Sequence, residues 1–358
     1  MPSLKEIKGR INSISSTLAI TSAMKMVAAA KLQKAQMAIQ NMLPYERRLY
    51  SMLVDLMGAM NISAAASEDG SVRGSGSAER GFDQSGDRLS LSNRHDLAGM
   101  DGAYSLMAQR EVRKVAIVAF ASNSSLCGAF NSNVIREATA VINEYRASGL
   151  RDSDIVVYSV GRKMAEAMRK LGFPSPADFT KMSDSPSYEA ASALAQELLD
   201  GFVSGRFDKV ELVYNHYKST SSQPTTRQTY LPLSLADATA DLQAGKIADS
   251  ASESDTNRGA EPVGAPVVRQ GSPTTEDLIV EPSKEALIVT LLPKVVRLRV
   301  FTTLLDSTAA EQAARTVAMQ LATDNGNDLL QELTLEYNKG RQQKITSEIL
   351  DIVGGSMQ

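Results

Sequence analysis

The chain has 358 residues, of which 43% are apolar, so it is long enough to bury a large hydrophobic core. Its formal net charge of −3 excludes a whole-chain electrostatic attraction to nucleic acid, and its single cysteine excludes an intrachain disulfide. No apolar run approaches the ~18 residues of a membrane span, and no apolar signal core opens the chain, so we expect a soluble protein of a reducing compartment.

Residues 1–60 carry a heptad pattern that predicts one long helix. Apolar side chains recur at alternating spacings of three and four from Leu4 to Leu56, which is typical of a coiled-coil seam. A helix of this length would span about 80 Å. Pro44 is expected to bend this helix or to end its first part. Residues 1–57 carry eight basic and three acidic side chains, hence a net charge of +5, which favours an acidic partner surface.

Two segments rich in polar residues, 61–105 and 236–277, are interpreted as flexible insertions. Residues 106–235 lie between them and alternate between strand-like and helix-like patterns. The expected strands are 112–120, 155–160, 209–217 and 226–232, and the expected helices are 134–148, 163–171 and 188–204. Strands separated by helices favour a parallel sheet, here with one antiparallel strand added, so we predict a small Rossmann-like α/β domain.

Residues 278–358 predict a second long helix. We expect a disturbance at Pro293 and a break near 306–308, where Ser307 or Thr308 followed by Glu311 resembles a capping box. The pair Gly354–Gly355 is expected to stop the helix. The apolar stripe of this helix is predicted to comprise Ala313, Val317, Leu321, Leu329, Leu330, Leu333, Tyr337, Ile345, Ile349 and Ile352. Because the chain order is helix, domain, helix, the two rods are expected to pair antiparallel.

Catalytic chemistry is difficult to assemble from this sequence. The two histidines are His95, in the first insertion, and His216, at a strand end, and each is interpreted as structural or as a surface residue. A thiol–imidazole pair of Cys127 and His216 is the alternative. Metal sites need clustered ligands, which we do not find, and residues 74–76 lack the strand and helix that a dinucleotide loop needs. We therefore expect no catalytic residues, no metal site and no cofactor, and a mechanical or scaffold role.

Five blocks of the chain resemble the γ subunit family of F-type ATP synthases. They are ITSAMKMVAAAK (20–31), SLCGAFN (125–131), EQAARTVAM (311–319), ATDN (322–325) and EYNKGRQQKITSEI (336–349). The blocks follow the family's order and cover both ends and the middle domain, leaving out only the two insertions.

This resemblance implies a fold and a function. The terminal helices would form an antiparallel coiled coil that enters the head of α and β subunits as a central rotor shaft. The α/β domain would lie at its foot beside the ε subunit and the membrane ring of c subunits. The chain would then be a non-catalytic part of a hetero-oligomer, peripheral to the cytoplasmic side of a bacterial inner membrane. Its rotation would carry the three catalytic β sites through their conformations.

The resemblance also implies a set of residues that contact the β subunit. They are Met24, Lys25, Gln312, Arg315, Arg341, Gln342 and Thr346. For Arg315 and Arg341 we expect bidentate pairing with β carboxylates, on the premise that both are exposed. Lys25 is expected to face an acidic β segment. Ile345 and Ile349 are instead expected to hold the seam.

One departure from the family pattern and two rival functions remain at this point. Gly340 stands where the family usually has alanine, which leads to the hypothesis of a more pliant upper shaft. The first rival is a coiled-coil scaffold or adaptor that binds another acidic partner. The second is a small nucleotide-using enzyme built on the Rossmann-like sheet.

Overall fold

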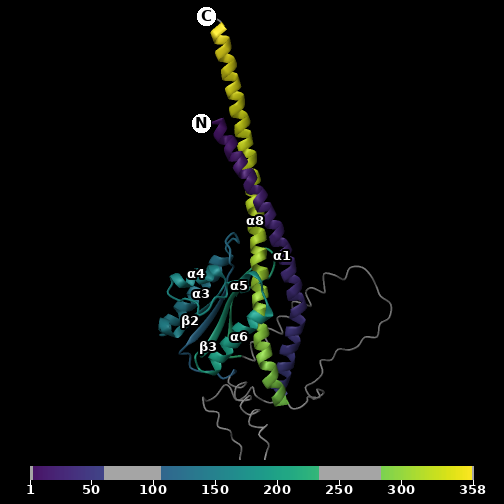
Figure 1. Ribbon diagram of the computed structural model, residues 1–358, viewed down its shortest axis with the longest axis vertical. Coiled ribbons are helices and arrows are strands. Elements are labelled where there is room, and N and C mark those ends of the chain that lie inside the picture. The colour runs from purple at the N-terminus through teal and green to yellow at the C-terminus, as the bar shows by residue number, and fades with distance from the viewer. Residues whose placement is uncertain (1–2, 60–105, 234–283, 357–358) are drawn as a thin grey trace, which may run out of the picture.

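A computed structural model describes residues 3–59, 106–233 and 284–356 of the chain. Two long helices lie side by side, and an α/β domain packs against their lower half (Figure 1). The segments expected to be flexible insertions, 61–105 and 236–277, lie entirely outside the described residues.

Helix α1, Leu4–Ala59, is continuous for 56 residues, and the predicted heptad is its buried face. Every heptad position from Leu4 to Leu56 is buried or half-buried. The expectation that Pro44 could end the first part of the helix is wrong, because the helix continues on both sides of it. A proline inside a helix costs about 3 kcal/mol, and packing of the flanking turns against the second long helix offsets this cost.

Helix α8, Lys284–Ser356, is continuous for 73 residues, so the predicted break at 306–308 and its capping box are wrong. The hydroxyl of Thr308 donates to the carbonyl four residues earlier at 2.8 Å, and Ser307 is buried. Packing on both sides of this point outweighs the local stop signal. The helix also includes Gly354–Gly355, which were expected to end it.

The two helices pair antiparallel, as predicted. Near the lower end, Arg299 Nη1 donates to Tyr50 Oη at 2.7 Å, and further up Thr323 Oγ1 donates to Thr21 Oγ1 at 3.1 Å. Residue numbers therefore rise along α1 while those of the facing residues fall along α8. The antiparallel coiled coil of terminal helices is confirmed.

The domain contains a four-stranded sheet in the order β2-β1-β3-β4. Its strands are β1 (Val115–Phe120), β2 (Ile155–Val160), β3 (Lys209–Asn215) and β4 (Thr225–Leu231). Strand β1 pairs parallel with both β2 and β3, and β4 pairs antiparallel with β3. The predicted parallel sheet with one added antiparallel strand is therefore confirmed, with ends that differ by up to three residues from those expected.

The connecting helices are α3 (Phe130–Ala147), α4 (Arg162–Lys170), α5 (Thr180–Asp184) and α6 (Tyr188–Val203), and a short 3-10 turn covers Asp152–Asp154. Helix α3 begins at Phe130 rather than at Val134, where the apolar pattern starts. Phe130 is buried in a small cluster with Ala310 of α8, so a tertiary contact fixes this helix start.

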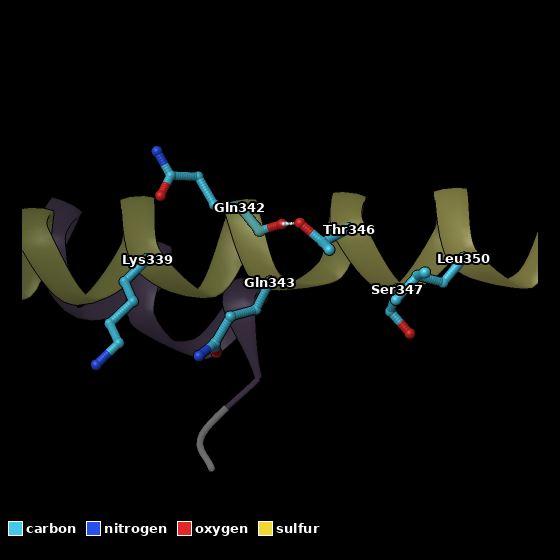
Figure 2. Close-up of a pocket in the computed structure, with 6 residues that line it drawn as sticks. All are labelled: Lys339, Gln342, Gln343, Thr346, Ser347 and Leu350. Carbon is cyan, nitrogen blue, oxygen red and sulfur yellow. Dashed lines mark hydrogen bonds between the residues drawn. The ribbon is translucent and has the colours of Figure 1, made fainter.

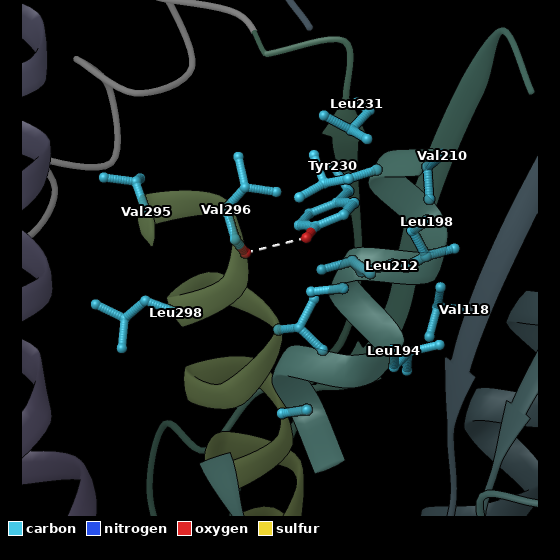
Figure 3. Close-up of a cluster of buried hydrophobic side chains, with 14 of the residues drawn as sticks. Val118, Leu194, Leu198, Val210, Leu212, Tyr230, Leu231, Val295, Val296 and Leu298 are labelled. Carbon is cyan, nitrogen blue, oxygen red and sulfur yellow. Dashed lines mark hydrogen bonds between the residues drawn. The ribbon is translucent and has the colours of Figure 1, made fainter. Parts of the chain in front are cut away.

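One hydrophobic core joins the domain to both long helices. Tyr230 of β4 is fully buried, and its hydroxyl donates to the carbonyl of Val296 in α8 at 3.0 Å (Figure 3). Around it lie Val118, Leu194, Leu198, Val210, Leu212, Leu231, Val295 and Leu298, and α1 adds Leu49, Leu53 and Leu56. The other face of the sheet packs against α3 and α4. The lower parts of α1 and α8 therefore form one body with the domain.

Candidate functional site

Above the domain, the seam of α8 contains two glycines that receive leucines of α1. A Cβ placed on Gly326 would lie 2.6 Å from Leu18 Cδ2, and one on Gly340 would lie 3.1 Å from Leu4 Cδ2. The two pairs are two heptads apart on each helix, so the same knob-into-hole contact is repeated. Gly340 therefore has a packing role, which the sequence interpretation did not include, and the hypothesis of a pliant upper shaft stays a prediction.

The seam of α8 agrees with the predicted stripe only in part: Leu330, Leu333 and Tyr337 lie in it, whereas Leu321 and Leu329 do not. The seam positions from Thr316 onward are buried or half-buried, as are the neighbouring Val317 and Ala318: Thr316, Met319, Thr323, Gly326, Leu330, Leu333, Tyr337 and Gly340. Leu321 and Leu329, which were predicted to lie in the stripe, are 58% and 45% exposed. This register was not predicted because several seam residues are small or polar, whereas a helical stripe is recognised in a sequence by its large apolar side chains.

Gln312 and Arg315 are buried, so the premise that Arg315 is exposed is wrong. Its guanidinium lies 2.6 Å from Glu311 Oε1 and donates through Nη1 to the carbonyl of Ser125 at 2.7 Å. The side chains of Arg315 and Glu311 are each only 9% exposed. Burial raises the pKa of Glu311, although Arg315 beside it acts in the opposite direction. These residues fasten the loop after β1 to α8.

That loop, residues 121–129, follows the carboxyl end of β1, where doubly wound sheets commonly bind nucleotides. Here Cys127 is buried with Phe130 against Ala310 of α8. Asn131 Nδ2 donates to Cys127 Sγ at 3.2 Å, so the thiol is part of the loop's own hydrogen-bond network. His216 binds Asp306 instead, so the thiol–imidazole alternative is wrong.

Met24 and Lys25 are half-buried in α1 at the level of the upper seam. Lys25 Nζ donates to Gln320 Oε1 of α8 at 2.7 Å. Its ammonium is thus hydrogen-bonded across the helix pair, a contact that the sequence interpretation did not include. Beside them Met26 and Val27 are 63% and 57% exposed, and they give this level of the shaft an apolar outer surface.

The last turns of α8 extend beyond α1 and form a tip, which we define as residues 341–353. Helix α1 begins opposite Gly340, so α8 continues beyond its partner (Figure 1). Arg341, Gln342 and Thr346 are exposed here, and Thr346 Oγ1 donates to the carbonyl of Gln342 at 2.9 Å (Figure 2). The seven predicted contact residues therefore fall at three levels: the tip, the upper seam and the buried loop–helix junction.

The expectation that Ile345 and Ile349 hold the seam is wrong, because no partner helix reaches them. They are 48% and 55% exposed, and Leu350, Ile352 and Val353 are exposed to a similar or greater extent. A shallow depression on the same tip is lined by Lys339, Gln342, Gln343, Thr346, Ser347 and Leu350 (Figure 2). The tip thus combines exposed polar groups with exposed apolar side chains.

In the part of the chain that the structure describes, no group of three or more His, Cys, Asp or Glu side chains is placed to hold a metal ion. No helix in the same residues combines the length and apolar character needed to cross a membrane.

Comparisons with known proteins agree over the whole chain. A family model described as "ATP synthase" matches residues 3–357. The "ATP synthase gamma chain" of Phocaeicola vulgatus is 46% identical over 357 residues, covering 100% of both chains. That of Bacteroides thetaiotaomicron is 44% identical over 358 residues with the same coverage. A solved structure of the Euglena gracilis mitochondrial ATP synthase (OSCP/F1/c-ring, rotational state 3) covers 99% of this chain and 93% of its own, with 19% identity and a TM-score of 0.52, which supports the fold alone.

Proposed function

The chain belongs to the family of ATP synthase gamma chains, and on this premise we propose that it is the central rotor shaft of an F-type ATP synthase. In this role it couples ion-driven rotation of a membrane ring to the conformational cycle of three catalytic β sites. The shaft forms and breaks no covalent bond and needs no cofactor of its own. The β subunits carry out the synthesis or hydrolysis of ATP.

The asymmetry of the shaft is the observation that supports this role best. One helix protrudes beyond the other at the top, and the α/β domain projects from one side below (Figure 1). A shaft without rotational symmetry presents a different surface to each of three surrounding sites in any one orientation. Turning it therefore favours a different conformation at each site in turn.

We propose that the tip enters the head formed by the α and β subunits. Its exposed apolar side chains, Ile345, Ile349, Leu350, Ile352 and Val353, would turn within an apolar bore. Arg341, Gln342 and Thr346 would make the polar contacts with β, since each is exposed on the tip. An exposed guanidinium can pair with a β carboxylate through two hydrogen bonds.

The surroundings of the other predicted contact residues indicate different roles for them. Met24 and Lys25 are half-buried, so we propose that they meet β through their outer edges, next to Met26 and Val27. Gln312 and Arg315 are buried within the chain. We therefore assign Arg315 to fastening the loop to α8, which shapes the surface that the head meets.

The remaining partners follow from the orientation of the shaft. With the tip in the head, the α/β domain lies at the opposite end, where it would meet the ε subunit and the ring of c subunits. This places the chain at the periphery of a membrane, on the cytoplasmic side of a bacterial inner membrane, held there through the complex.

Copurification with the other subunits tests the proposal. Coexpressed with α and β subunits, the chain is expected to form one complex that hydrolyses ATP, and a bead attached to the α/β domain should rotate. Recovery of an active head that contains α and β but lacks this chain, or turnover of ATP by this chain alone, would overturn the proposal.

A further inference from the structure

The end of strand β3 is held by one carboxylate of α8. Asp306 Oδ2 lies 2.6 Å from His216 Nδ1, and Asp306 Oδ1 accepts a hydrogen bond from the backbone N–H of Tyr217 at 2.9 Å. The side chain of Asp306 is 16% exposed, whereas that of His216 is 50% exposed. Both oxygens of a largely buried carboxylate thus point at two consecutive residues of the domain.

The neighbouring tyrosine reaches three parts of the molecule. Tyr217 packs against a cluster formed by Leu32 and Ala35 of α1 with Ala309 and Ala313 of α8. It also packs against the cluster of Cys127, Phe130 and Ala310, which belongs to the loop after β1 and to α8. Its hydroxyl accepts a hydrogen bond from Gln36 Nε2 of α1 at 2.6 Å. A single residue therefore contacts both long helices and the domain.

These contacts lie just above the large core that joins domain and shaft. The large core that joins the domain to α8 ends at Leu304, just before Asp306. Higher up, at Lys25 and Gln320, the hydrogen bonds run between α1 and α8 alone. The end of β3 therefore lies between this large core and the higher contact of the domain with α8, in which Arg315 donates to the carbonyl of Ser125.

We propose that Asp306, His216 and Tyr217 form a latch that fastens the end of strand β3 to both long helices and that holds most tightly while His216 is protonated. Asp306 is the positioning residue, because it orients both domain residues. The mechanical consequence rests on the proposed function: a weaker latch leaves the shaft above Leu304 less firmly held by the domain when it carries torque.

The direction in which the stability of the latch changes with pH follows from the pKa of His216. Its hydrogen bond to Asp306 raises the pKa of His216, while burial and the nearby charge of Lys218 act in the opposite direction. Helix α1 contributes the neutral Gln36 to this junction. A raised pKa in the folded state means that the charged pair stabilises the latch fully below about pH 6.5, the usual histidine value. That stabilisation is lost as the pH rises through the raised pKa.

Hydrogen exchange of the full-length chain, alone and assembled with the head, measures the latch. After correction for the intrinsic exchange rate, the Tyr217 amide should be about threefold to tenfold more protected at pH 6 than at pH 8.5, a modest change because His216 is half-exposed. His216→Lys keeps a charge at both pH values, and His216→Gln keeps none. Both variants should show no pH dependence, with the lysine variant the more protected. Strand β2 serves as the internal control.

Each alternative result is decisive. The latch is refuted if the wild type shows equal protection of Tyr217 at both pH values, or if Asp306→Asn protects this amide as well as the wild type does. Failure of the chain to assemble with the head would overturn the proposed function and leave the exchange result for the chain alone intact. Assembly with pH-independent exchange would overturn the latch and leave the rotor function intact.

Discussion

Two arginines that the sequence pattern treated alike have opposite surroundings. Arg315 is buried between Glu311 and the carbonyl of Ser125, while Arg341 is exposed on the tip. The difference depends on where the loop after β1 folds back, and Ser125 is far from Arg315 in the sequence. Local patterning contains no signal for such a contact, so it could not be predicted.

Replacing each arginine with alanine should separate these roles. Arg315→Ala leaves a buried carboxylate without its guanidinium, so we expect the free energy of unfolding to fall by about 3 kcal/mol. Arg341→Ala removes an exposed side chain and should change it by no more than about 0.5 kcal/mol. Urea unfolding of the full-length chain measures both. Equal losses in the two variants would contradict the assignment of Arg315 to the interior.

The glycine at position 326 gives a second prediction. Gly326→Ala gains up to about 1 kcal/mol of helix propensity, but its methyl group would overlap Leu18 Cδ2 at 2.6 Å. We therefore expect no gain in thermal stability, whereas the control Gly9→Ala, which meets no atom within 4 Å, should stabilise the chain. In a Leu18→Ala background, Gly326→Ala should become stabilising. Additive effects of the two substitutions would exclude the knob-into-hole contact.

At the scale of whole elements, periodic patterns predicted more than local signals did. The heptad of α1 and the strand at 155–160 are found as predicted, since each depends on repeated burial along one face. The prediction of a break at 306–308 was wrong, because tertiary packing keeps α8 helical despite the local capping signal. The prediction that Ile345 and Ile349 lie in the seam was wrong, because an apolar repeat does not reveal where the partner helix begins.

Shortening α8 tests that last point. Among the side chains that a chain ending at Lys344 loses, the described ones make no seam contact, because those of 345–350, 352 and 353 are exposed. We expect its melting temperature to stay within about 2 °C of the full-length value, while its affinity for the head falls. Leu333→Ala, a buried seam residue, is the matched control and should lower the melting temperature. A large loss of stability in the shortened chain would show that the tip is packed.

At the scale of the whole molecule, the order of elements was sufficient to predict two antiparallel rods with an α/β domain between them. The level at which the domain meets the shaft could not be predicted. That level is fixed by contacts such as Tyr230 with Val296 and His216 with Asp306, which join residues far apart in sequence. Both helices share a core with the domain, so shaft and domain should turn as one body.

A covalent link between the two helices tests whether they rotate together. Thr21 and Thr323 place their Oγ1 atoms 3.1 Å apart across the seam, so cysteines at both positions should form a disulfide after a small shift. If α1 and α8 already rotate as one unit, the disulfide restricts no motion between them. The oxidised complex should therefore keep nearly all of its ATP hydrolysis and rotation. Ala23→Cys with Thr323→Cys is the control, since Ala23 is exposed and should not cross-link. Inhibition that a reductant reverses would mean that the two helices slide or turn against each other during the cycle, and that the shaft is not one rigid pair.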